Sequence, residues 1–212
     1  DLGLDETASK TVQTSGNVSV QLNCGIAANS NNRQAMFLTG DVDISVPMMM
    51  TAGDIVDNTR SGTENVDVQV THSRRIEDPY EDLDVPFYGG CDQNNMQITS
   101  STTLAPGVYC GGIKIASGAN VDMQPGTYVM DAGDFDVSGN AVLNGSDVTI
   151  ILTSSHGSTG SLAITGGTEV NLSAPTDGEY GGVLFYQDRN ANPSGVSKVT
   201  GNADLHVDGA IY

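Results

Sequence analysis

Three aspartates in the second half of the chain carry carboxylates, the groups that glycosidases and Ca²⁺ sites use. Asp131, Asp134 and Asp136 occur within one short stretch, and the alternation of side chains along a strand places Asp134 and Asp136 on one face. Two carboxylates about 5 to 10 Å apart can hydrolyse a glycosidic bond, and clustered carboxylates can bind Ca²⁺. One hypothesis is therefore a carbohydrate-active enzyme, a polysaccharide lyase or hydrolase, that uses Asp134, Asp136 and Asp188.

The other interpretation of these aspartates is an acidic face exposed to water, and we favour it. A lyase also needs a basic side chain as catalytic base, and from residue 96 onward the chain has only Lys114, Arg189 and Lys198. We find no Gly-x-Ser-x-Gly elbow, no His-Glu-x-x-His motif and no zinc-type spacing of Cys and His. The sequence predicts no catalytic residues, no metal ligands and no cofactor, with Ca²⁺ at the aspartates as the one candidate ion.

The cysteines predict one disulfide. The chain has three, Cys24, Cys91 and Cys110, so at least one has no mate within it. Cys91 and Cys110 flank a single predicted strand and turn, and we expect them to be bonded to each other, the alternative being buried free thiols. Cys24 is then the odd residue.

The composition limits both the fold class and the partners. The 212 residues carry a formal net charge of −18, which argues against nucleic acid and anionic membrane surfaces as partners. Glycine is abundant, Trp is absent and only 16% of residues are charged, as is typical of a β-protein rich in turns. No apolar stretch of about 18 residues is present. The sequence starts at Asp1 and stops at Tyr212 within a predicted strand, so we expect a processed or partial piece of a longer protein.

The elements that must position these side chains are short strands that return at regular intervals. Pro-Gly-x-Tyr occurs at 106–109 and 125–128, and Ser-Gly begins a second repeated phrase at Ser117 and Ser138. A period of about 20 residues is typical of stacked arrays in which each strand covers the apolar face of its neighbour. We predict an all-β fold, a right-handed parallel β-helix or solenoid-like stack of short strands.

Residues that tolerate a positive φ angle should turn the chain between strands. The predicted structural turns are at Gly107, Gly118, Gly126, Gly139, Asn140, Gly201 and Asn202. If the strands stack in register, the amides of Asn17, Asn140 and Asn202 would form a hydrogen-bonded ladder along the stack.

Four segments divide the chain. Residues 1–14 form an N-terminal tail, 15–75 a β-rich part of the stack, 76–95 an acidic connection containing proline, and 96–212 the regular coils. The connection is either a linker or a segment that lies along the side of the stack. Its carboxylates offer a second place where Ca²⁺ could stabilise the protein.

With these residues laid out, the chain resembles the C-terminal region of TadG-like putative Flp (Tad) pilus-assembly proteins of bacteria. The phrases that carry the resemblance are residues 104–113, 125–130, 137–141, 148–153, 172–189 and 209–212, with a looser match through Cys24-Gly25-Ile26-Ala27 and Asp78-Pro79. The string Phe185-Tyr186-Gln187-Asp188-Arg189 is the most specific. The membrane-anchoring helix with which such proteins begin is not in this sequence.

The resemblance implies a protein exported to the bacterial envelope, extracellular or at the cell surface, with a structural role and no catalytic residues. Joined to the predicted stack, it leads us to expect a non-catalytic structural or adhesive component of a pilus or cell-surface assembly. The expected partners are further copies of the chain in a homo-oligomer, or filament or pilus subunits, and a surface glycan.

Overall fold

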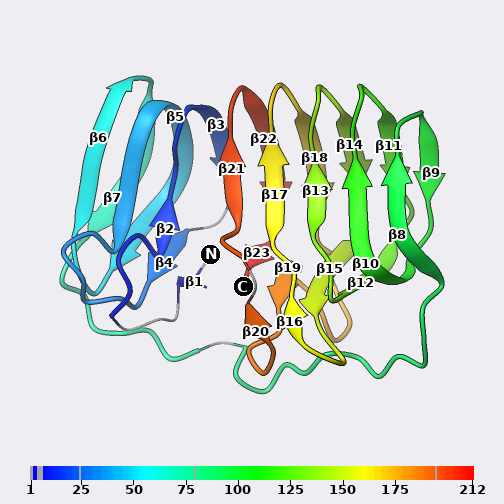
Figure 1. Cartoon of the computed structure of the whole chain (residues 1–212). Helices are drawn as coiled ribbons and strands as arrows, with labels where there is room; N and C mark the ends of the chain where they lie inside the picture. The colour runs from blue at the N-terminus through cyan, green and yellow to red at the C-terminus, as the bar shows by residue number, and fades with distance from the viewer. Residues whose placement is uncertain (1, 4–6, 24, 79, 194) are drawn as a thin grey trace.

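The protein is all-β, as predicted. The computed structural model describes residues 2–3, 7–23, 25–78, 80–193 and 195–212, and within them it contains strands and no helix (Figure 1). Two large sheets, of 12 and 9 strands, carry the structure, and a two-stranded sheet lies beside them. Neighbouring strands in these sheets run parallel to each other. No helix among the described residues has the length and apolar character needed to cross a membrane.

The bounds of the strands follow. The 12-stranded sheet contains β1 (Leu2–Gly3), β2 (Val12–Gln13), β3 (Asn17–Leu22), β4 (Ile26–Ala28), β5 (Met36–Thr51), β6 (Ile55–Ser61), β7 (Glu64–Val70), β9 (Thr102–Leu104), β11 (Asn120–Met123), β14 (Val142–Gly145), β18 (Glu169–Ser173) and β22 (Ala203–Asp208). The 9-stranded sheet contains β8 (Gln93–Ile98), β10 (Gly107–Ile115), β12 (Gly126–Asp131), β13 (Phe135–Val137), β15 (Val148–Thr153), β17 (Leu162–Thr165), β19 (Val183–Gln187), β21 (Lys198–Thr200) and β23 (Ala210–Ile211). The small sheet contains β16 (Ser158–Thr159) and β20 (Asn192–Pro193).

The strands are not stacked in the order of the sequence. β3, near the N-terminus, pairs with β22, near the C-terminus, and we call this pairing the seam; in it Val20 lies opposite Leu205. From β3 the chain builds outward through β5 to β6 and β7 at one end of the stack (Figure 1). It then runs along the side to β8 and β9 at the other end, and the later strands lead back to β22. Both chain termini therefore lie near the middle of the stack, and both of its ends are built from internal segments.

The alternation of apolar and polar residues explains the two faces of the large sheet. Residues paired in register form columns, and one column faces the space between the sheets. Its members, from one end of the stack to the other, are Thr102, Val121, Leu143, Val170, Leu205, Val20, Ile44 and Glu64. The six apolar members pack into one continuous core that runs the length of the stack.

The repeat is less regular than the sequence indicates. Gly107 lies opposite Tyr128, so the two Pro-Gly-x-Tyr phrases do not face each other in register. The number of residues between successive members of the column increases along the chain, from Val121 and Leu143 to Val170 and Leu205. The extra residues form loops and the small sheet outside the core, so the inward column stays in register.

Six of the seven predicted turn residues have positive φ angles: Gly107, Gly118, Gly126, Gly139, Asn140 and Gly201. Asn202 is not in that region of backbone space. Two features make glycine necessary at position 201. The φ angle of Gly201 is 89°, and an added Cβ would lie 2.8 Å from the backbone nitrogen of Gly166.

The acidic connection lies along the side of the stack. We call the described residues 76–78 and 80–88 the strap. A second apolar cluster lies between the strap and the outer face of the 9-stranded sheet, and its members are Ile151, Tyr180, Val183 and Tyr186 with Tyr80, Leu83, Val85 and Tyr212. At the start of the strap, Asn29 and Ile76 exchange two hydrogen bonds of 2.8 and 2.9 Å. The strap thus replaces water over an apolar outer face of the 9-stranded sheet.

Two groups of polar contacts hold the strap in place. Asp78 accepts hydrogen bonds from Arg189 at 2.8 Å and from the Tyr212 hydroxyl at 2.6 Å. Further along, the hydroxyl of Tyr186 donates to the carbonyl of Leu83 at 2.5 Å. Because burial removes water from its hydroxyl, the pKa of Tyr186 is raised.

Candidate functional site

The outward face of the 12-stranded sheet carries the most regular set of polar side chains in the described chain. One outward column contains Thr103, Asp122, Asn144, Asn171, His206, Gln21, Ser45 and Asn65, each paired with the next in register. Neighbouring strands of a sheet lie about 4.8 Å apart, so this column presents hydrogen-bonding groups at a fixed repeat.

Amides in this column bond to one another. The amide of Asn171 donates to the side-chain oxygen of Asn144 at 3.1 Å, and that of Asn144 donates to Asp122 at 3.3 Å. These bonds join other residues than the ladder predicted for Asn17, Asn140 and Asn202. In the expected column Gly167 follows Asn140, and an added Cβ on Gly167 would lie 2.6 Å from the Asn140 side-chain oxygen. The missing side chain at Gly167 interrupts any ladder there.

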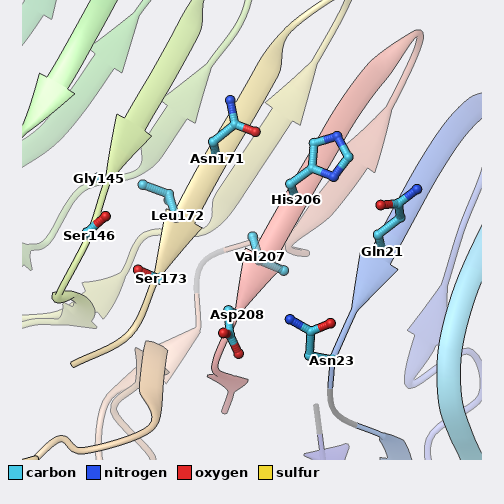
Figure 2. A pocket seen from close by; sticks show the side chains of 10 residues that line it. All are labelled: Gln21, Asn23, Gly145, Ser146, Asn171, Leu172, Ser173, His206, Val207 and Asp208. Atoms are coloured by element: carbon cyan, nitrogen blue, oxygen red, sulfur yellow. The ribbon is translucent and has the colours of Figure 1, made fainter. Parts of the chain in front are cut away.

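A shallow trough of about 310 Å³ lies along the middle of this face, across the seam (Figure 2). Its lining residues come from β3, β14, β18 and β22 and the residues that follow them: Gln21, Asn23, Gly145, Ser146, Asn171, Leu172, Ser173, His206, Val207 and Asp208. In Figure 2 Asn171, His206 and Gln21 follow one another across three neighbouring strands, with Asp208 and Asn23 below them. The trough exists only because the N-terminal β3 docks on β22.

The trough offers many hydrogen-bonding groups and few charges. Its amides and hydroxyls can both donate and accept, and Asp208 adds an acceptor. His206 has its Nε2 atom 3.3 Å from a carboxylate oxygen of Asp204, just outside the trough. Such a surface is suited to a ligand with many hydroxyl groups, and its open form is suited to a long ligand that lies across several strands.

The aspartates singled out in the sequence are bonded to nearby groups, and two of them, Asp134 and Asp136, line one shallow groove of about 240 Å³ with Lys114. Asp131 accepts two hydrogen bonds of 2.8 Å from Ser155, and Asp134 accepts hydrogen bonds of 2.7 and 3.0 Å from Ser161. Each carboxylate therefore fixes the start of a following segment by binding both its backbone N–H and its hydroxyl.

The two remaining candidate carboxylates are also engaged. Asp136 lies 3.6 Å from Lys114 in an ion pair on the outer face of the 9-stranded sheet. Asp188 accepts hydrogen bonds from the hydroxyl of Thr153 at 2.6 Å and the backbone of Asn190 at 2.8 Å. Across the described ranges no three or more His, Cys, Asp or Glu side chains are grouped so that they could hold a metal ion.

The predicted disulfide between Cys91 and Cys110 is confirmed. It fixes the chain where the acidic connection ends and the first strands of the far end begin. Cys24, the odd cysteine, lies outside the described residues, as does Pro79 of the Asp78-Pro79 phrase.

Sequence reasoning missed the residues of the trough. The signal was present, because Asn171 and His206 stand at polar positions between buried residues of their strands. The sequence does not reveal that β22 pairs with β3, and the trough depends on this pairing.

Comparison of the chain with models of protein families, with curated proteins and with solved structures found no match to any of them.

Proposed function

We propose that the chain is a right-handed parallel β-helix that serves as a non-catalytic structural and adhesive component of an extracellular cell-surface assembly, and that it binds a surface glycan in the trough. The observation that carries the proposal is the outward polar column with the trough beside it. Hydrogen-bonding side chains held at a strand repeat on a stiff sheet form a preorganised surface, which lowers the entropy lost on binding.

Three further features support this role. The aspartates available for glycoside hydrolysis are bonded to nearby backbone, hydroxyl or lysine groups, which favours binding over hydrolysis. The disulfide is typical of an oxidising compartment outside the cytoplasm. The resemblance to TadG-like pilus-assembly proteins agrees with an exported protein whose role is structural or adhesive.

A panel of immobilised polysaccharides tests the adhesive role. We expect the protein to retain at least one neutral or acidic glycan, and the double variant Asn171→Ala/His206→Ala to lose most of that binding. Gln97→Ala, an exposed polar change on the 9-stranded sheet, is the matched control and should bind as the parent does. Retention that is equal in the parent and the double variant would remove the trough from the proposal.

The same panel separates binding from catalysis. If the protein shortens a polysaccharide or releases sugars from it, and Asp134→Asn abolishes that release, the carbohydrate-active alternative replaces the adhesive one.

A further inference from the structure

The two ends of the stack differ in the residues that close the core. At one end β6 and β7 pair only with β5, and at the other end β8 pairs with β10 and β9 with β11, among the described residues. Each end therefore presents strands with one unpaired edge. Such an edge is a template on which another strand can add.

At the β6–β7 end, two carboxylates take the place of apolar core residues. Glu64 is the last member of the inward column and lies opposite Ile44, which is buried. Asp57 lies opposite Leu38, which is also buried. Because parallel partners in register point to the same side of a sheet, both carboxylates point over the open end of the core.

The two carboxylates meet there. The pKa of Glu64 is raised by burial and by the nearby charge of Asp57. The pKa of Asp57 is lowered by hydrogen bonds from Thr59, whose backbone N–H donates to it at 2.8 Å. As pH falls, Glu64 is thus the first of the pair to bind a proton.

Other charged groups near this end lie at exposed positions. Asp41 and Asp43 on β5 accept hydrogen bonds of 2.8 Å from Ser61 and Thr63 respectively. Arg60 on β6 and Asp67 on β7 are exposed.

The opposite end carries no charge in its inward positions. Thr102 ends the same inward column there, and Met96 and Ile98 are the inward residues of β8, opposite Ile113 and Ile115. Nearby side chains of β8 are the uncharged amides of Gln93, Asn94 and Gln97. A second copy placed head to tail would continue the strands in parallel and set its Thr102 hydroxyl against Glu64.

We propose that the β6–β7 end docks the β8–β9 end of a second copy of this chain, and that the inward carboxylates Asp57 and Glu64 block this docking while both are charged. Burying two carboxylates between stacked copies removes water from both, and like charges at short distance add to that cost. Inward charges are a recognised means of protecting a sheet edge. Neutralising the pair opens the end to filament growth.

This inference deepens the structural role proposed above and relies on it only for its biological setting. The experiment measures self-association and not glycan binding, so either proposal can fail while the other stands.

The test is the mass in solution of the Asp57→Asn/Glu64→Gln variant by analytical ultracentrifugation at neutral pH. We expect the parent to be monomeric and the variant to form dimers and longer species as concentration rises. Asp67→Asn, a neutralised outward acid on the same strand β7, is the matched control and should remain monomeric.

Two additions keep the test decisive. Thr102→Glu in the neutralised background places a charge on the other end and should restore the monomer. Mild acidification should cause the parent to self-associate, and it should change the self-association of the Glu64→Gln variant only slightly. A folded neutralised variant that stays monomeric, or association that survives Thr102→Glu, would overturn the proposal. If the double variant does not fold, Glu64→Gln alone answers the question in the same way.

Discussion

Removing the Cys91–Cys110 disulfide should lower the stability of the whole stack by an amount set mainly by the loop that it closes. The two cysteines are 19 residues apart. The chain-entropy relation for a loop of that length gives about 3 kcal/mol of stability at 25 °C. For a protein of this size, a loss of 3 kcal/mol lowers the melting temperature by roughly 6 to 12 °C.

The loss should reach the whole stack and not only the loop. The disulfide fixes β8 and β9 at the end of the stack and also holds the chain just beyond the strap. When the disulfide is removed, the strap keeps its contacts to Arg189 and Tyr186, but the chain that follows it is no longer held at Cys91. Edge strands should therefore exchange amide hydrogens first, before the strands at the seam.

The assay is urea unfolding of the parent and of Cys91→Ala/Cys110→Ala, followed by circular dichroism. Reductant should destabilise the parent and leave the double variant unchanged, which separates loss of the disulfide from loss of the two sulfur atoms. A double variant within about 1 kcal/mol of the parent would refute the loop argument, since it predicts a loss about three times larger.

Two other expectations concern the strap and the seam. Burial raises the pKa of Tyr180 and Tyr186 above the ordinary value of 10.0. The two hydroxyls therefore contribute fully to the stability of the fold below pH 10, and this contribution is lost as pH rises above it. Melting curves across that range check this, and a midpoint that does not change with pH would contradict it. Leu205→Ala removes a buried side chain at the seam and should cost about 2 to 5 kcal/mol in chemical denaturation. Val196→Ala, at an exposed position, is its control, and equal losses in the two variants would show that the seam is not a stabilising contact.

Much of the fold was predictable because strand alternation is a local signal. Val42, Ile44 and Val46 alternate with polar residues and are buried in β5, as the period of two requires. The disulfide was also predicted, although its cysteines enclose two strands, β8 and β9, and not the single strand expected. In the methionine run, Met49 points into the core while Met48 is partly exposed, which matches the opposite directions of neighbouring side chains on a strand.

The order of the stack was not predictable, because alternation says which face of a strand is buried and not which strand lies beside it. Val20 and Leu205 face each other across the seam, but their apolar side chains could equally pack against other apolar residues. The trough depends on that neighbour relation, and so does the placement of Asp57 and Glu64 at a free end. In sequence these two acids are simply polar residues of a strand.

The aspartates of the carbohydrate-active alternative show what the order of residues does not reveal. Asp131 and Asp134 are close in sequence, but each binds a different serine, Ser155 after β15 and Ser161 after β16. The sequence shows that an aspartate is present, but only the structure shows which groups its carboxylate contacts.

The seam has a consequence for how the molecule is made. β3 lies near the start of this sequence, whereas β22, on which it docks, lies near its end. While the protein folds, the edge of β3 stays unpaired until β22 has formed, and contacts so distant in sequence form slowly. At high protein concentration the unpaired edge of β3 in one molecule can meet β22 of another, so that two chains exchange strands and each completes its neighbour.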